Sequence, residues 1–84
     1  MPETVYTNLY EITELQQKIM RFVDYWVHVE KGPIPRKVII DQMIERNEKE
    51  RTVENALNGL LNLGYIRRAV ITSNKTYYVQ LRRL

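Results

Sequence analysis

The stretch that decides the fold is Thr52–Arg68, which reads TVENALNGLLNLGYIRR. Its apolar residues recur every three or four positions, which predicts one face of an amphipathic helix. These residues are Val53, Ala56, Leu57, Leu60 and Leu63. Gly64 follows where a left-handed helix cap belongs, because glycine adopts positive φ without a steric cost. Tyr65 and Ile66 then begin a run rich in aromatic and β-branched residues, so we expect the helix to lead directly into a strand.

The opposite face of this expected helix is polar. It carries Arg51, Thr52, Asn55 and Asn58, whose side chains can hydrogen-bond base edges or phosphates. Gly59 lies inside the helix, where glycine costs about 1 kcal/mol relative to alanine. It indicates a close approach at this point, either by DNA or by the first helix.

Two further helices are expected before this one. Thr13–Gln16 fits a capping box, so the first helix is expected over 13–31, ending at Gly32 and Pro33. Its apolar face comprises Leu15, Ile19, Phe22, Val23, Trp26 and Val29. The second helix is expected over 35–46, with a buried face of Val38, Ile39, Met43 and Ile44. The helix of the opening stretch is expected over 49–63.

The last part of the chain, 65–84, predicts a β-hairpin. Ser73-Asn74-Lys75 is a tight turn signal, because asparagine tolerates left-handed φ. Alternation in the last strand places Tyr77, Val79 and Leu81 on the core face. Ile34 lies between two prolines, which hold it extended, so it could add a short third strand.

The composition is that of one small globular domain. The chain has 84 residues, 44% of them hydrophobic and 27% charged, which predicts a single domain over 1–84 with an extension over 1–12. The expected helices and hairpin make its class α+β. The chain contains no cysteine and one histidine, so we expect no disulfide, metal or other cofactor. We also expect no membrane span and no signal peptide, which makes a cytoplasmic location the default.

Positive charge is concentrated in the expected hairpin. Residues 65–84 hold five basic residues and no acid, whereas the first 64 residues hold the other eight basic residues and all ten acids. The five are Arg67, Arg68, Lys75, Arg82 and Arg83. A basic hairpin on a slightly acidic body indicates a polyanionic partner. The alternative is a solvated strand edge that discourages aggregation.

The order helix, extended segment, helix, tight turn, helix and hairpin is that of a winged helix. The stretch Thr52–Arg68 resembles the winged helix-turn-helix pattern in which Thr-Val opens the recognition helix and Gly-Tyr-Ile-Arg-Arg leads into the wing. The region 13–84 is similar to the DNA-binding domain of SOS-response repressors of the LexA type and to many small transcriptional regulators. The matching residues are Leu15, Gln17, Ile19, Trp26, Gly32, Pro33, Ile34, Pro35, Thr52, Val53 and Gly64–Arg68. The protease domain of full SOS repressors has no counterpart in this sequence, so we do not expect such a repressor.

The resemblance implies binding to double-stranded DNA by a small transcriptional regulator that works as a homodimer, with the third helix in the major groove. From that helix, the residues expected to face DNA are Lys49, Arg51, Thr52, Asn55 and Asn58. The residues expected to contact the phosphate backbone are Arg67, Arg68 and Lys75 of the wing and Arg36 and Lys37 at the start of the second helix.

Two features favour a different function, a winged-helix protein-interaction module in a larger assembly. Glu48, Glu50 and Glu54 cluster around the third helix, where carboxylates would be repelled by phosphate. Surplus apolar surface also surrounds the first helix, where the N-terminal segment packs or a dimer contact forms. The dimer-contact candidates are Tyr6, Tyr10, Met20 and Val27. An enzyme is not expected, because the one histidine has no partner set and no glycine-rich phosphate loop occurs.

Overall fold

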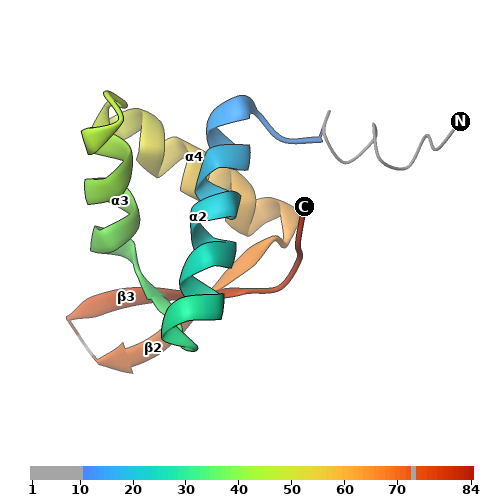
Figure 1. Ribbon diagram of the computed structural model, residues 1–84, viewed down its shortest axis with the longest axis vertical. Coiled ribbons are helices and arrows are strands. Elements are labelled where there is room, and N and C mark those ends of the chain that lie inside the picture. The colour runs from blue at the N-terminus through green and yellow to red at the C-terminus, as the bar shows by residue number, and fades with distance from the viewer. Residues whose placement is uncertain (1–10, 73) are drawn as a thin grey trace, which may run out of the picture.

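The chain forms an α+β fold in which three described helices pack beside an antiparallel sheet (Figure 1). The computed structural model describes residues 11–72 and 74–84. The helices are α2 (Glu14–Glu30), α3 (Arg36–Glu45) and α4 (Glu50–Leu63). The strands are β1 (Ile34–Pro35), β2 (Ile66–Thr72) and β3 (Lys75–Gln80). The α+β class predicted from the sequence is confirmed.

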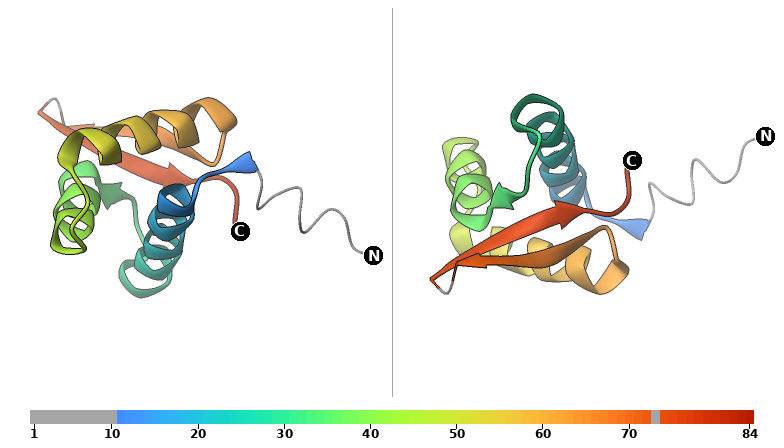
Figure 2. Two further views of the ribbon diagram at one scale, coloured as in Figure 1. Left: turned by 90° about the horizontal axis from the view of Figure 1, so that it is seen from above. Right: turned by 90° about the horizontal axis from the view of Figure 1, so that it is seen from below.

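The sheet has the order β1-β3-β2, with both pairings antiparallel. The short third strand predicted at Ile34 is present, because Ile34 pairs with Tyr78 and Pro35 with Tyr77. The hairpin of β2 and β3 crosses one side of the helices (Figure 2). The chain ends beside the middle of α2, where Arg83 and Leu84 lie next to Met20, Arg21 and Asp24.

The predicted helix ends are formed by local hydrogen bonds. The Thr13 hydroxyl accepts from the Gln16 backbone N–H at 3.2 Å, and the Gln16 side chain accepts from the Thr13 N–H at 2.8 Å, which completes the capping box. Gly64 ends α4 with φ of 80°, the left-handed conformation expected for it. At the end of α2 it is Lys31, one residue before Gly32, that adopts this conformation, with φ of 54°.

The core lies where the three described helices and the sheet meet. Its buried members from the helices are Ile19, Met20, Val23, Ile39, Ile40, Met43, Val53, Ala56, Leu57 and Leu60. Those outside the helices are Ile12, Ile34, Tyr65, Ile66 and Tyr78. Three residues expected in the core, Val29, Ile44 and Leu63, are exposed. Each lies in the last turn of its helix. The apolar periodicity of each helix therefore continues for one turn beyond the part of the helix that is buried.

The prediction for the face of the last strand was wrong. Tyr78, not its neighbour Tyr77, is buried with 2% of its surface exposed, and Leu81 is 53% exposed. Two adjacent tyrosines satisfy either alternation of the strand. The choice between them is made by pairing, because β3 is the central strand and Tyr78 lies between Ile34 of β1 and Arg68 of β2.

Helices α2 and α4 approach each other closely at Gly59. The Gln16 side chain is 8% exposed, and its Nε2 donates to the Ala56 carbonyl oxygen at 3.2 Å. A Cβ added to Gly59 would overlap Gln16 Nε2. Of the two approaches that Gly59 indicated, it is therefore the first helix that comes near it.

We expect Gly59→Ala to lower the free energy of unfolding by about 1 kcal/mol. The gain in helix propensity is about 1 kcal/mol, but displacing the Gln16 amide leaves buried polar groups unpaired, at about 1–3 kcal/mol. Urea unfolding measures the change. In a Gln16→Ala background the obstacle is gone, so the same substitution should stabilise the chain. The same sign in both backgrounds would contradict this account.

Candidate nucleic-acid interface

The outward face of α4 carries a polar stripe. The buried residues Val53, Ala56, Leu57 and Leu60 fix the inward face, so the opposite side chains point to solvent. Arg51, Thr52, Asn55 and Asn58 are all exposed, as predicted from their spacing. Asn62 is exposed on the same face and extends the stripe by a further turn. Asn62 was not among the residues expected from the sequence to face DNA, although it lies four residues after Asn58 on the same helical period.

The stripe from Arg51 to Asn62 is about 16 Å long at the rise of an α-helix. Lys49 lies just before the N-terminal end of the stripe; it is exposed and is the N-cap of α4, with φ of −87° and ψ of 142°. Arginine and asparagine side chains are the ones that form paired hydrogen bonds to guanine and adenine in the major groove. The stripe therefore has the dimensions and the chemistry for reading base edges.

Two of the three acids near α4 are paired with the body of the protein. Glu54 Oε2 lies 2.7 Å from Arg36 Nη2, and this hydrogen bond is the main reason that the pKa of Arg36 is raised. Glu48 Oε2 lies 3.9 Å from Lys18 Nζ of α2. Within residues 11–72 and 74–84, Glu50 is the one acid of the three that makes no ion pair. Most of the negative charge at the start of α4 is therefore compensated.

The hairpin presents three exposed basic side chains: Arg67, Arg68 and Lys75. None of them forms an ion pair in the part of the chain that the structure describes. Arg68 is opposite the buried Tyr78, so it belongs to the sheet face that packs on the helices, while Arg67 belongs to the outer face. The two arginines therefore project from opposite faces of β2.

The tip of the hairpin, Asn74–Tyr77, lies close to the starts of α3 and α4. Together they line a groove of about 710 Å³ that includes Arg36, Lys37 and Glu50. The structure thus brings Lys75 to the same groove as Arg36 and Lys37. Both of these are engaged, however, since Lys37 Nζ lies 3.0 Å from Asp41 Oδ2 and Arg36 binds Glu54. Their positive charge is offset locally.

The other two basic residues of the hairpin region are held against the body. Arg82 stacks over the Tyr65 ring, 4.0 Å from its centroid, and its Nη2 lies 3.3 Å from Glu11 Oε2. Arg83 Nε lies 3.1 Å from Asp24 Oδ1 on α2. Of the five positive charges in this region, only the three on β2 and the hairpin tip therefore have no ion-pair partner among the described residues.

Tyr65, Arg82 and Glu11 form one cluster. The Tyr65 hydroxyl donates to Glu11 Oε2 at 2.9 Å. Hydrogen bonds from Tyr65 and Arg82 lower the pKa of the Glu11 carboxyl, and burial together with the bond to Glu11 raises the pKa of Tyr65. Each shift favours the protonation state that keeps the cluster intact at neutral pH.

Of the four residues expected at a dimer contact, Met20 and Val27 lie in the described part of the chain. Met20 belongs to the core with 1% of its surface exposed, so the prediction that it widens the free flank of α2 was wrong. Hydrophobic periodicity could not show that Met20 is buried, because the width of the buried face of α2 depends on its contacts with α3, α4 and the sheet. Val27 is half-buried beside Gly32, Pro33 and Val79. Tyr6 and Tyr10 lie outside the described residues.

Among residues 11–72 and 74–84, no cluster of three or more His, Cys, Asp or Glu side chains could hold a metal ion. None of the described helices is both long and apolar enough to cross a membrane. No protein family, curated protein or solved structure matches the chain. The function therefore has to be inferred from the chain itself.

The Glu11 cluster predicts a pH-dependent stability. Because the folded pKa of Glu11 lies below its ordinary value of 4.5, the cluster stabilises the fold above that pH and loses this contribution as pH falls through the folded value. Glu11→Gln should therefore destabilise the chain at about pH 7 and much less at about pH 3. Urea unfolding at both values tests this. In an Arg82→Gln background the cost of Glu11→Gln at neutral pH should shrink, and an unchanged cost would show that the two residues act separately.

Proposed function

We propose that the chain binds double-stranded DNA as a winged helix, with α4 in the major groove and the hairpin against the phosphate backbone. The observed order of helices and strands, with a short strand before α3 and a hairpin after α4, is compatible with this layout. The proposed role is that of a small transcriptional regulator acting as a homodimer, which the resemblance of Thr52–Arg68 suggests.

The observation that carries the proposal is the pairing of Glu48 with Lys18 and of Glu54 with Arg36. These pairs offset the acids that argued against DNA, and they leave an outward stripe of one arginine, one threonine and three asparagines. The major groove is about 12 Å wide and admits a helix of this kind. In this arrangement Arg51 and Asn55, near the start of α4, would contact base edges.

The backbone contacts would come from the unpaired cations of the hairpin. Lys75, at the tip, lies in the groove that reaches the start of α4, and Arg68 belongs to the helix-facing side of β2. Arg67 projects from the other face of the strand and would contribute charge at longer range. Arg36 and Lys37 would contribute less than their position suggests, because each already has a carboxylate partner.

The test is selection of duplexes from a random pool at low salt, followed by affinity measurements as salt is raised. Each phosphate contact should contribute about 0.9 to the slope of log affinity against log salt. A mass measurement of the free chain and of its complex with the selected duplex would determine whether it binds as a dimer. No binding to any duplex at low salt would rule the proposal out.

Two substitutions should distinguish residues that recognise the base sequence from residues that contact the phosphate backbone. Arg51→Ala should relax the sequence preference of the selected duplexes, whereas Lys75→Ala should weaken all duplexes alike and lower the salt slope by about 1. The matched control is Arg83→Ala, since Arg83 is an arginine bound to Asp24 away from α4 and should change neither quantity. If Lys75→Ala altered preference and Arg51→Ala did not, the two roles would be reversed.

Glu50 provides a gain-of-affinity test. It is exposed at the start of α4 beside the hairpin groove, without an ion-pair partner in the described ranges. Glu50→Gln removes a charge that repels phosphate, so duplex affinity should rise severalfold at low salt and the gain should shrink as salt screens it. Glu45→Gln, at the end of α3, is the matched control. An equal gain in both variants would mean that only net charge matters.

A further inference from the structure

A second candidate surface lies between α2 and α3, away from the outward face of α4. It is a groove of about 470 Å³ lined by Lys18, Arg21, Phe22 and Tyr25 of α2, Gln42 of α3 and Arg46 just after α3. Helices α2 and α3 lie on one side of the molecule and α4 on the other (Figure 2). The groove and the polar stripe of α4 are therefore separate surfaces.

The floor of the groove is aromatic. The rings of Phe22 and Tyr25 are stacked, with centroids 6.4 Å apart and planes inclined by 19°. Trp26 meets Phe22 edge-on at 6.5 Å. Tyr25 is 60% exposed, and Val29, one turn further along α2, is exposed as well. These residues make an apolar strip along α2, in which Phe22 and Trp26 pack partly against the core while Tyr25 and Val29 stay exposed.

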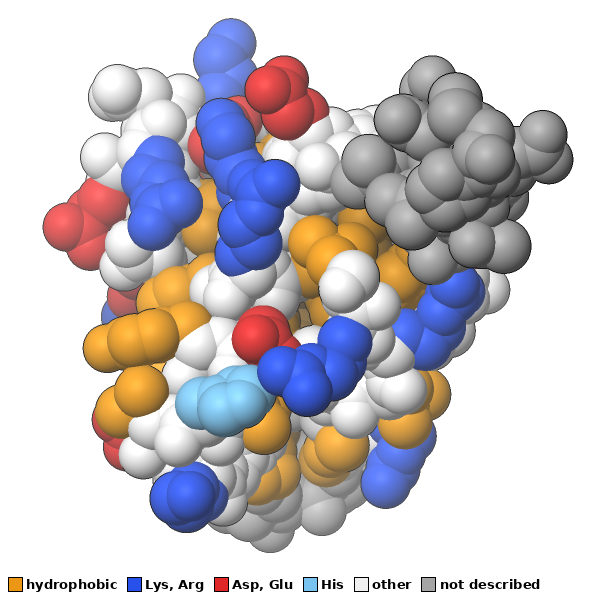
Figure 3. All heavy atoms as spheres, turned by 45° about the vertical axis from the view of Figure 1, so that its right-hand side comes forward, with side chains coloured by type: hydrophobic (Ala, Val, Ile, Leu, Met, Phe, Trp, Pro, Cys, Tyr) orange, Lys and Arg blue, Asp and Glu red, His pale blue; other side chains and the backbone are white. Residues whose placement is uncertain are grey.

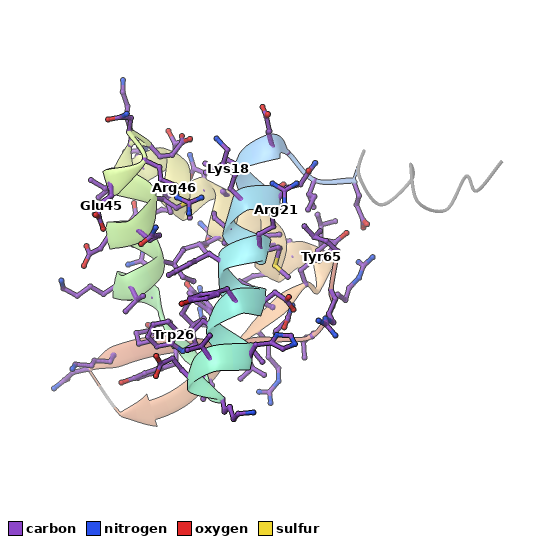
Figure 4. The ribbon with its side chains drawn as sticks, viewed as in Figure 1. Lys18, Arg21, Trp26, Glu45, Arg46 and Tyr65 are labelled. Carbon is purple, nitrogen blue, oxygen red and sulfur yellow. The ribbon has the colours of Figure 1, made fainter. Side chains whose placement is uncertain are left out.

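The rim of the groove is basic. Arg21 and Arg46 are exposed, and neither forms an ion pair within residues 11–72 and 74–84. Arg46 extends toward α2, whereas the neighbouring Glu45 points away from it (Figure 4). In the space-filling view, basic side chains lie on either side of hydrophobic ones at the upper left (Figure 3). The apolar strip is thus bordered by two arginines that form no ion pair in the described ranges, and by Lys18, which is paired with Glu48.

We propose that this groove binds an acidic amphipathic helix from another protein. Its apolar face would lie on Phe22, Tyr25 and Val29, and its carboxylates would form paired hydrogen bonds with Arg21 and Arg46. Two packed helices leave a groove between them, and the side-chain ridges of a third helix can pack into it. The inference is independent of DNA binding, because it uses no residue of α4 or of the hairpin.

The apolar floor favours a protein over a nucleic acid. A phosphate backbone would require a track of unpaired cations along its path, whereas here Lys18 is already paired with Glu48 and two arginines flank a hydrocarbon surface that a duplex cannot bury. Bidentate carboxylate pairing by arginine and burial of leucine or phenylalanine on aromatic rings use both parts of the groove. The partner class is therefore defined by its chemistry, apolar on one face and acidic on its flanks.

The experiment uses the full chain and a synthetic peptide of about four helical turns, with leucines at i, i+3, i+4 and i+7 and glutamates on both flanks. Binding can be followed by the emission of Trp26, the one tryptophan of the chain, and by anisotropy of a labelled peptide. We expect binding that weakens about tenfold or more in the double variant Arg21→Glu, Arg46→Glu. The exposed Tyr25→Ser should also weaken it.

Three controls decide the outcome. Lys31→Glu reverses an exposed charge outside the groove and should leave binding unchanged. A peptide with serines in place of the leucines should bind weakly, and equal binding would overturn the proposal in favour of unspecific charge attraction. Undiminished binding by the double variant, with its helical circular dichroism intact, would also overturn it.

Two other occupants would be recognised by the same variants. If single-stranded DNA binds and the double variant abolishes that binding while the peptide does not bind, the groove belongs to nucleic acid. If the chain forms a concentration-dependent dimer that Tyr25→Ser disrupts, and the peptide does not compete, the groove belongs to a second copy. Either result would overturn the proposal.

Discussion

One amide group joins the two helices on which the rest of the structure depends. The Gln16 side chain accepts the Thr13 N–H, which caps α2, and donates to the Ala56 carbonyl in the middle of α4. It is the buried polar side chain of the described core, and Gly59 leaves the space that it fills. Because a buried amide without partners would cost about 1–3 kcal/mol, both helices are held to one relative position. That position turns the asparagine stripe of α4 outward.

The features that depend on neighbouring residues were predictable from the sequence. The capping box at Thr13, the left-handed Gly64 and the extended Ile34 each follow from local backbone chemistry, and each is present. The buried face of α4 also follows from its period, apart from its last turn. Local rules extend this far because the hydrogen bonds and the dihedral preferences involved span only a few residues.

The features that depend on distant residues were not predictable. Adjacent Tyr77 and Tyr78 fit either strand face, and only the central position of β3 in the sheet decides between them. From the sequence, the charge of Glu54 argues against DNA binding and that of Arg36 argues for it. In the folded chain these two side chains form an ion pair at 2.7 Å. Of the candidate interface, the exposed stripe and the hairpin cations could be inferred, but their net electrostatic balance could not.

The edge of the sheet at β1 is poorly suited to pairing with a further strand. Within residues 33–35 only Ile34 has a backbone N–H, because its two neighbours are prolines. An incoming strand would find at most one donor there, and Ile34 is itself buried. The sheet can therefore grow only beside β2, where Arg67 and Arg68 of two approaching copies would repel each other. The arrangement closes one edge by lack of hydrogen-bond donors and guards the other by charge, and both features work against edge-to-edge pairing of sheets.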